Sequence, residues 1–333
     1  MDKQKRNRAA ILSALSKLGA PASSVSLTQF LAASGHNLSE RTVRLYLRKL
    51  EAEGLTASRG KRRMITEKGL AELRASQMLQ RVGYLSAKID QMTYGMTFDL
   101  VTRTGLVVVN MTVVDPRHLA ACEEEIRQVF ALGYAMGNLL ALLPPGESLG
   151  DWIVPPDRLG VCTVCSITLN GVLLKHGVPS RSRFGGLLEL RDGRPTRFVE
   201  MIHYDGTSID PLEVFIRSGM TDYRGAVRDG NGLIGASFRE MPEKARDLAV
   251  QLADRVSAVG LGGFMEIGWP GQPVLELPVS PGRIGVVIIG GLNPIAVLEE
   301  HGHRVDSRAL AGLLEYSRLF HFDELPKALA QYL

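Results

Sequence analysis

The sequence is poor in cysteine and has no long apolar run. Its 333 residues contain only three cysteines, Cys122, Cys162 and Cys165, too few for a disulfide framework in a chain of this size. The most apolar stretch, residues 285–292, is too short to span a bilayer. The charged residues 1–8 are not followed by the apolar segment of a signal peptide. We therefore expect a cytoplasmic protein.

Charge is present but unevenly distributed. Hydrophobic residues make up 45% of the chain and charged residues 22%, a composition that buries a globular core. Residues 1–80 hold 15 Lys and Arg but only 6 Asp and Glu, a net charge of +9, whereas the rest of the chain carries −5. A small basic segment joined to a slightly acidic one is typical of a nucleic-acid-binding module attached to a second domain.

The basic segment has the element order of a winged helix-turn-helix. Apolar spacing predicts helices over residues 8–18, 27–33 (capped by Ser26) and 40–52, then a hairpin over 56–65 and a helix over 66–79. In the third helix, Val43, Leu47 and Leu50 follow helical spacing and are expected to face inward. We therefore assign residues 1–80 to a winged helix-turn-helix DNA-binding domain.

The predicted DNA contacts lie on the third helix and on the hairpin. The helix is expected to enter the major groove, and the basic hairpin to contact phosphates. Alternatively, the arginines form an ordinary solvated helix face, or the hairpin binds RNA or a protein. The predicted DNA-binding residues are Ser39, Arg41, Thr42, Arg44, Arg48, Arg59, Lys61, Arg62 and Arg63.

The remainder of the chain contains an internal repeat. The segment RLGV at 158–161 matches RIGV at 283–286, and GLLE at 186–189 matches GLLE at 312–315, with offsets of 125 and 126 residues. Residues 81–325 are therefore predicted to form one domain from two copies of a unit, residues 81–195 and 196–325. The fold class is α+β: a winged helix followed by an internally duplicated α/β domain. We attribute the glycine excess, 35 residues, to paired turns such as Gly185-Gly186 and Gly290-Gly291.

The strand-to-helix turns of the repeat are the best candidates for a small-molecule site. Gly290-Gly291 leaves an apolar strand and precedes a helix, where backbone N–H groups favour an anion. No GxGxxG or GxxxxGK[ST] motif occurs there, which argues against a nucleotide. These glycines and the nearby arginines could also be purely structural. The predicted effector-binding residues are Ser166, Thr168, Asn170, Arg183, Gly290, Gly291, Asn293 and Arg308.

Two other kinds of function stay open. One is a metabolite-processing enzyme fused to the winged helix, for which Glu200 and His203 supply polar groups but no nucleophile–base set, so we predict no catalytic residues. The other is a redox or metal sensor at Cys162 and Cys165. Strand alternation separates these two sulfurs and no second cysteine pair exists, so we predict no metal ligand.

Four segments carry a family resemblance. They are CSITLNGVLL (165–174), SRFGGLLE (182–189), DPLEVFI (210–216) and GRIGVVIIGGLNP (282–294), and they resemble the regulatory domain of the NrpR nitrogen-regulation repressors. Residues 1–80 are similar to the winged helix that precedes this domain in the family, a type also named after ribonuclease R. The resemblance covers residues 6–320.

The resemblance implies a transcriptional repressor that binds double-stranded operator DNA as a homodimer or larger assembly. It implies 2-oxoglutarate as an effector ligand that releases DNA when nitrogen is scarce, and no other cofactor. Some family members carry two regulatory domains in tandem, whereas this chain has the length for one.

Overall fold

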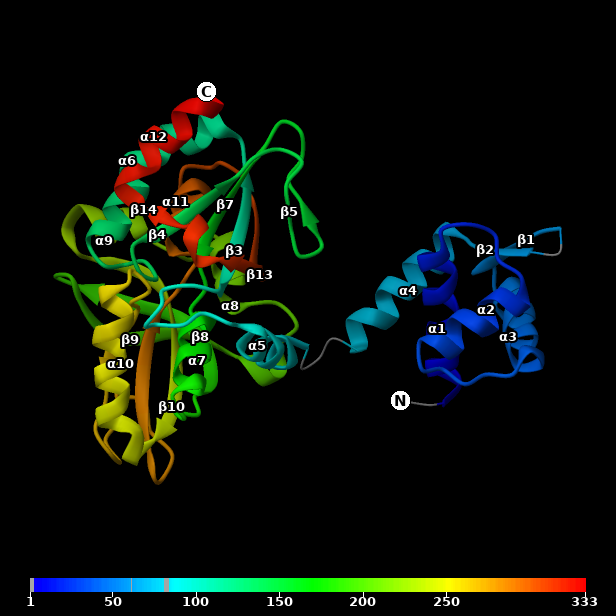
Figure 1. The fold of residues 1–333 in the computed structure, drawn as a ribbon, viewed down its shortest axis with the longest axis horizontal. Coiled ribbons are helices and arrows are strands. Elements are labelled where there is room, and N and C mark those ends of the chain that lie inside the picture. The colour runs from blue at the N-terminus through cyan, green and yellow to red at the C-terminus, as the bar shows by residue number, and fades with distance from the viewer. Residues whose placement is uncertain (1–2, 61, 81–83) are drawn as a thin grey trace. The chain divides into compact units, whose positions relative to one another are not determined.

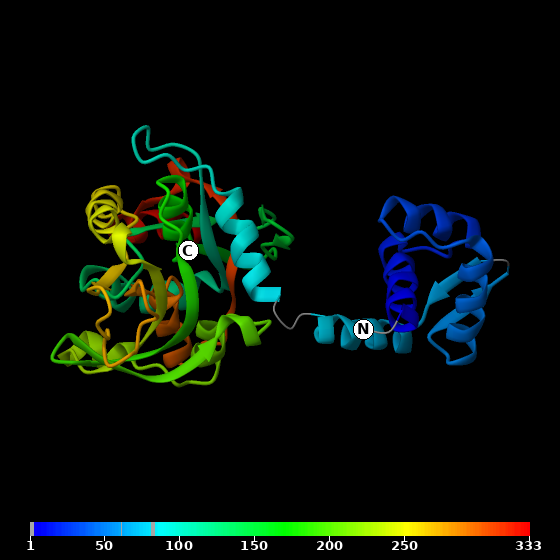
Figure 2. The same cartoon turned by 90° about the horizontal axis from the view of Figure 1, so that it is seen from below.

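The computed structural model describes residues 3–60, 62–80 and 84–333 and divides into two compact units. We call Met1–Val82 the head and Gly83–Leu333 the body. Figures 1 and 2 show the two units as ribbons in perpendicular views. No helix in the described part of the chain has the length and apolar character needed to cross a membrane.

The head is a winged helix, as predicted. Its elements are α1 (Lys3–Leu18), α2 (Ser24–Ala33), α3 (Glu40–Ala52), the hairpin strands β1 (Thr56–Arg59) and β2 (Arg62–Ile65), and α4 (Glu67–Gln80). Ile11, Leu31 and Leu50, each at most 1% exposed, form the centre of its core. The predicted start of the second helix is wrong, because Ser23 rather than Ser26 is the cap, its Oγ accepting from Ser26 N at 3.1 Å.

The body contains two five-stranded antiparallel sheets. The first has the order β13-β3-β7-β4-β14, and the second has the order β11-β12-β10-β8-β9. A two-stranded ribbon, β5-β6, is separate from both. The bounds are β3 Leu106–Val114, β4 Leu139–Leu143, β5 Ser148–Leu149, β6 Trp152–Ile153, β7 Leu159–Val164, β8 Arg181–Arg191, β9 Arg194–His203, β10 Gly232–Pro242, β11 Phe264–Ile267, β12 Arg283–Ile289, β13 Asp306–Glu315 and β14 Phe320–His321.

The two sheets repeat one design and exchange strands between the sequence copies. Val109 of β3 pairs with Val164 of β7, and the corresponding Ala236 of β10 pairs with Ile289 of β12. One long strand of each copy joins the sheet of the other, since β13 pairs with β3 and β8 pairs with β10. The duplicated α+β fold is thus confirmed. The division we drew between residues 195 and 196 falls inside β9.

Helices cover the sheets and share one core with them. The helix α6 packs against α9, α11 and α12, and α5 packs against α7 and β13 (Figure 1). The bounds are α5 Tyr84–Gly95, α6 Pro116–Ala131, α7 Ile167–Lys175, α8 Pro211–Arg217, α9 Tyr223–Asp229, α10 Arg246–Ala258, α11 Asn293–Glu300 and α12 Leu325–Leu329. Short 3₁₀ turns lie at Tyr204–Gly206, Glu243–Ala245, Tyr316–Arg318, Phe322–Glu324 and Ala330–Tyr332.

The predicted glycine turns have different outcomes. Gly290-Gly291 does lie between β12 and α11. Gly185-Gly186 lies inside β8, so the turn predicted there is wrong. A Cβ on Gly186 would lie 2.4 Å from the carbonyl oxygen of Glu200 on β9, and a Cβ on Gly185 would lie 2.9 Å from the Pro211 side chain. These glycines are therefore explained by close packing of the strand against its neighbours.

Candidate functional site

The recognition helix of the head presents arginine on the face opposite its buried side. Val43, Leu47 and Leu50 are buried and hold α3 on the head core. Arg41 and Arg48 are exposed and form no ion pair with any described residue. Because exposed guanidinium groups without partners are available for phosphate or base contacts, this face has the chemistry of a DNA-binding surface.

Ser39 and Thr42 organise the start of α3. The Ser39 Oγ accepts from the Thr42 backbone N–H at 3.2 Å and lies 2.8 Å from the Thr42 hydroxyl. Ser39 therefore caps the helix as a serine at this position normally does. Both residues lie at the end of α3 from which a recognition helix of this class reads base edges.

Arg44, also predicted to contact DNA, has partners within the head. Its guanidinium pairs with Glu40 one turn earlier, and its Nε donates to Ser24 Oγ at 3.2 Å. Hydrogen bonds from Ser24 and Arg44 lower the pKa of Glu40, which keeps that carboxylate ionised. Arg44 is therefore positioned by α2 and its own helix and would have to leave Glu40 to bind a phosphate.

The hairpin carries a second group of cations. Arg59 and Arg62 are exposed and lie directly opposite each other in the β1–β2 register. Like charges facing each other repel, and a bound phosphate would relieve that repulsion. Arg63 instead pairs with Glu51 of α3 at 3.2 Å, with its backbone bridged to Ala22. Lys61 lies outside the described residues.

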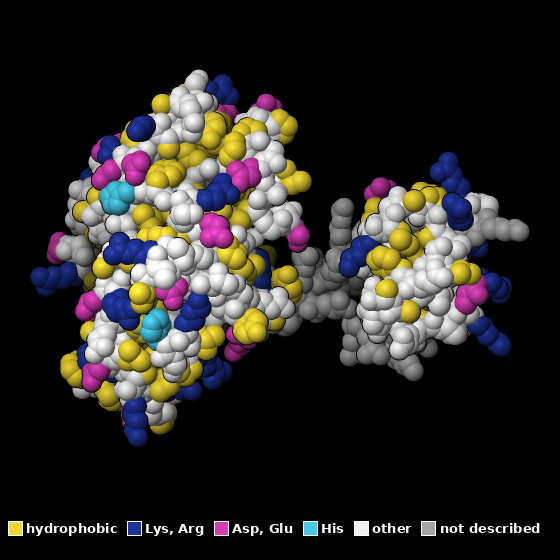
Figure 3. Space-filling model, in the orientation of Figure 1, with side chains coloured by type: hydrophobic (Ala, Val, Ile, Leu, Met, Phe, Trp, Pro, Cys, Tyr) yellow, Lys and Arg dark blue, Asp and Glu magenta, His cyan; other side chains and the backbone are white. Residues whose placement is uncertain are grey.

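The surfaces of the two units differ in charge. In Figure 3, dark-blue Lys and Arg side chains protrude from the head next to a few magenta carboxylates, and on the body the two colours are interspersed. This agrees with a net charge of +9 for residues 1–80 and −5 for the rest. The electrostatic attraction for DNA is therefore concentrated on the head.

The glycine turn of the body is closely packed. A Cβ on Gly291 would lie 2.3 Å from the Val164 carbonyl oxygen, and one on Gly290 would lie 2.4 Å from Asn293 Oδ1. The buried Asn293 side chain donates to the carbonyl oxygens of Tyr134 and Gly235, at 2.8 and 2.9 Å. The turn and Asn293 thus hold the end of β12 against the rest of the body.

The predicted residues of the first copy lie together around α7. Thr168 Oγ1 donates to the Val108 carbonyl oxygen and accepts from the Val108 N–H, at 2.9 and 3.0 Å. Ser166 and Asn170 both accept hydrogen bonds from the guanidinium of Arg239 on β10. The structure therefore brings two predicted residues together on one buried cation that the sequence analysis did not select.

The two predicted arginines of the body, Arg183 and Arg308, contact other groups than those around Arg239. Arg183 Nε is 3.8 Å from Glu240 Oε2, and Glu240 also accepts from the Ser280 N–H at 2.8 Å. The Arg308 guanidinium stacks over the Trp152 ring, 4.1 Å from its centroid. Each of these arginines therefore has a structural partner of its own.

Arg239 could have been found by comparing the two copies. It lies in the buried strand β10, and its register partner on β8 is Ser182. At the same place in the first sheet, Thr112 pairs with Ser307 on β13. The equivalent positions thus hold a threonine in one copy and an arginine in the other. This difference, which hydrophobic periodicity alone does not show, singles out Arg239.

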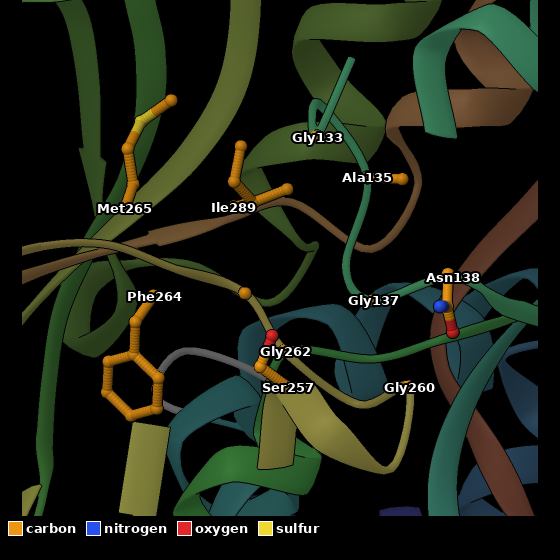
Figure 4. A pocket seen from close by; sticks show the side chains of 11 residues that line it. Gly133, Ala135, Gly137, Asn138, Ser257, Gly260, Gly262, Phe264, Met265 and Ile289 are labelled. Carbon is orange, nitrogen blue, oxygen red and sulfur yellow. The ribbon is translucent and has the colours of Figure 1, made fainter. Parts of the chain in front are cut away.

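Two of the cavities in the described part of the body bear on the predicted residues. One, of about 270 Å³, has five glycines among its eleven lining residues, and Figure 4 shows Asn138 and Ser257 as its polar side chains. The other, of about 340 Å³, lies under α5 and is lined by Ser86, Ile89, Asp90, Thr93, Asn170, Leu174, Pro179, Ser180, Arg181, Ser182, Tyr204 and Asp205. We call the second one the α5 cavity. Of the predicted effector residues, Asn170 lines it.

The cysteines of the body are buried. Burial raises the pKa of the Cys162 thiol to about 12 and that of the Cys165 thiol to about 11, so neither is a reactive thiolate at neutral pH. No group of His, Cys, Asp and Glu in the described chain is arranged to hold a metal ion. Glu200 and His203, considered for an enzyme, are exposed on β9.

Models of known protein families match both units. The model of a family described as the NrpR regulatory domains NRD1 and 2 matches residues 82–321, and the ribonuclease R winged-helix domain matches residues 9–73. A winged helix with an exposed basic recognition face, joined to a duplicated domain, defines the class of winged-helix DNA-binding regulators. The chain belongs to the NrpR family of global nitrogen regulators, which is a family of transcriptional regulators and not of enzymes.

Named relatives support this assignment. The global nitrogen regulator NrpRI of Methanosarcina mazei is 31% identical over 86% of this chain and 88% of its own length. The global nitrogen regulators NrpR of Methanococcus maripaludis and Methanocaldococcus jannaschii are 30% and 28% identical, and the chain spans only 54% and 55% of their lengths. A crystal structure of a nitrogen repressor-like protein from Methanococcus jannaschii is 26% identical, with a TM-score of 0.60 over 71% of this chain and 97% of that one.

Proposed function

We propose that this chain is a transcriptional repressor that binds operator DNA as a homodimer and releases it when the body binds 2-oxoglutarate. The observation that carries the DNA-binding part is the exposed face of α3, where Arg41 and Arg48 have no ion-pair partner in the described chain. The names of the relatives, which are global nitrogen regulators, support nitrogen control. A cytoplasmic location follows from this role, because the DNA and the metabolite are both there.

In this proposal the head binds the DNA sequence, and the body controls the separation of the two heads in a dimer. The first turns of α3 (Ser39, Arg41, Thr42) lie near base edges, while Arg48, Arg59 and Arg62 contact phosphates. A dimer binds two half-sites only when its two heads have the matching separation. An effector that prefers one arrangement of the body shifts the population of binding-competent dimers by the difference in its affinity for the two arrangements.

The effector is proposed to be a small dicarboxylate with a keto group, and 2-oxoglutarate is the one that the family resemblance implies. Hydroxyl, amide and guanidinium groups gather around α7, including Ser166, Asn170 and Arg239. These groups donate hydrogen bonds of the kind that carboxylates and ketones accept.

The test uses a fluorescent DNA duplex that the full chain has selected from a random-sequence pool. Its Kd is measured by anisotropy at fixed salt, without and with millimolar 2-oxoglutarate, and the mass of the complex is measured by light scattering. We expect two chains per duplex and a higher Kd with 2-oxoglutarate. An unchanged Kd would reject 2-oxoglutarate as the effector, and failure to select any sequence would reject the repressor.

A further inference from the structure

Arg239 is a buried cation without a counter-ion. Its side chain is 0% exposed, and its guanidinium donates to the Ser166 carbonyl oxygen at 3.1 Å, to Ser166 Oγ at 2.7 Å and to Asn170 Oδ1. All of these acceptors are neutral, and it forms no ion pair with any carboxylate of the described chain. Its buried Nε has no hydrogen-bond partner there either. Burial lowers the pKa of this guanidinium, but an arginine side chain stays protonated in proteins.

The fold itself does not require an arginine at this position. The duplicated sheet has Thr112 there, and Thr112 satisfies its neighbour with a 2.9 Å hydrogen bond between its hydroxyl and that of Ser307. Ser182 stands opposite Arg239 just as Ser307 stands opposite Thr112. An unpaired buried charge destabilises a protein, so its presence in one copy and absence in the other indicates a role in binding an anion.

The α5 cavity lies next to this cation, with Asn170 between them. Asn170 lines the cavity, accepts from Arg239 through Oδ1, and has its Nδ2 3.4 Å from Ser182 Oγ. Two further residues of the lining, Thr93 and Ser180, have buried hydroxyl oxygens without a partner in the described chain. Buried polar groups are almost always satisfied, so unpartnered ones that gather at one cavity indicate a missing polar ligand.

The charged residues that line the cavity, Asp90, Arg181 and Asp205, are all exposed. Asp205 lies 3.9 Å from Arg181. Asn170, Ser182 and Tyr204 carry no charge. Asn170 bonds to Arg239, Ser182 is its register partner, and the charges of both Asp210 and Arg239 act on the Tyr204 hydroxyl. The volume of about 340 Å³ is at the lower end of the range for small-molecule sites. An anionic group is therefore favoured at the end of the cavity that lies next to Asn170 and Arg239.

We propose that the α5 cavity binds a small carboxylate metabolite, whose carboxylate replaces Asn170 as the acceptor for the Arg239 guanidinium. The Thr93 and Ser180 hydroxyls donate to the remaining polar atoms of the ligand. This inference rests on the proposed function only in taking the ligand to be the effector. The inference adds the location of the binding site and the residues that hold the ligand.

The cavity lies against the helix with which the described part of the body begins. Ser86, Ile89 and Thr93 line the cavity from α5, which packs against α7 (Figure 1). In the sequence, α5 begins at Tyr84 and the last helix of the head, α4, ends at Gln80. The element that a ligand would contact is therefore the first described helix of the body.

The test compares equivalent substitutions in the two sheets of the full chain. Arg239→Thr installs the residue that the first sheet carries at this place, and Thr112→Val changes the same position in the first sheet as the control. Kd for 2-oxoglutarate is measured by titration calorimetry, with glutarate and succinate as alternative probes. We expect Arg239→Thr to weaken binding at least about tenfold and Thr112→Val to leave it unchanged. Equal binding by the wild type and Arg239→Thr would overturn the proposal.

A second variant covers the case in which Arg239→Thr does not fold. Ser180→Phe fills the cavity while leaving Arg239 in place, and we expect it to lose binding. If the wild type binds none of the three carboxylates, or Ser180→Phe binds them normally, the site is refuted.

The readouts also separate this proposal from the proposed function. Binding that depends on Arg239 without any change in the Kd for DNA would support the site and refute the effector role. An effect of 2-oxoglutarate on DNA binding that persists in Arg239→Thr would support the effector role and refute the site.

Discussion

In the head, Arg41 and Arg48 extend into solvent from α3 without an ion pair to any described residue, whereas in the body Arg239 is fully buried and contacts neutral groups. Water solvates the two exposed guanidinium groups, so keeping them charged costs the fold little. The buried one is costly to keep charged and has a threonine at its counterpart in the other sheet. In the functions proposed above, the head uses exposed charge to bind a polyanion, and the body uses a buried charge beside a cavity to bind a small anion.

The largest effect is expected from removing the exposed cations. The Arg41→Ala/Arg48→Ala double variant should weaken binding of the selected duplex by about 1–3 kcal/mol for each arginine. The slope of log Kd against log salt should fall by about one for each phosphate contact removed. Anisotropy titrations at several salt concentrations measure both quantities. The matched control is Arg228→Ala, an exposed arginine of the body, and an equal loss there would show that the charge of the head is not special.

A core substitution tests whether the two units are stabilised independently. Leu50 is 0% exposed in the head core, and Leu50→Ala should lower the free energy of unfolding of the head by about 2–5 kcal/mol. Calorimetry should show one transition shifted and the other unchanged. Leu252→Ala, at a 1% exposed position of the body, is the reciprocal control. Parallel shifts of both transitions in either variant would contradict two separately stabilised units.

The buried acids of the body make their contribution to its stability fall as the pH rises toward neutral. Burial raises the pKa of Asp210 to about 6 and that of Glu213 to about 7, with the nearby Lys88 opposing both shifts. These two carboxyls hold more protons in the folded body than in the unfolded chain between about pH 4 and 7, so their contribution to the free energy of unfolding falls as the pH rises through that window. Asp210→Asn keeps the acceptor for the Leu212 N–H and should remove up to about 3 kcal/mol of this fall.

Denaturant unfolding at several pH values measures that prediction. The transition of the head, which Asp210→Asn should leave as it is in the wild type at each pH, serves as the internal control. If Asp210→Asn leaves the pH dependence of the body unchanged, the raised pKa of Asp210 is refuted.

The smallest effect separates helix capping from DNA binding at Ser39. Ser39→Ala removes the acceptor for the Thr42 N–H and should destabilise the head by about 1 kcal/mol. Ser39→Asp restores the acceptor but places a negative charge near the DNA. Urea unfolding and anisotropy together should find Ser39→Asp as stable as the wild type but weaker in binding. Normal DNA binding by Ser39→Asp would remove the start of α3 from the interface.

Much of the fold could be predicted from local patterns. The spacing of Val43, Leu47 and Leu50 identified α3, and the repeated motifs fall at the same register in both sheets. The exchange of β8 and β13 could not be predicted, because a strand has the same apolar pattern whichever sheet it joins. Gly185-Gly186 was misplaced because a glycine pair predicts a turn, whereas here it allows close strand packing.

The candidate sites were less predictable than the fold. The arginines of α3 follow from spacing, but the ion pair of Arg63 with Glu51 depends on how the hairpin packs on α3. Ser166 and Asn170 were predicted as turn donors, yet the residue that unites them, Arg239, comes from a distant strand of the other copy. A contact between residues about 70 positions apart requires the tertiary structure.

The most direct test of the account measures DNA and 2-oxoglutarate binding together, in the wild type and in two full-length variants. We predict that Arg41→Ala/Arg48→Ala loses affinity for the selected duplex and keeps its Kd for 2-oxoglutarate. Arg239→Thr should bind the duplex like the wild type but no longer release it when 2-oxoglutarate is added. If each variant instead lost both activities in parallel, the division of the chain into a DNA-binding head and an anion-sensing body would be contradicted.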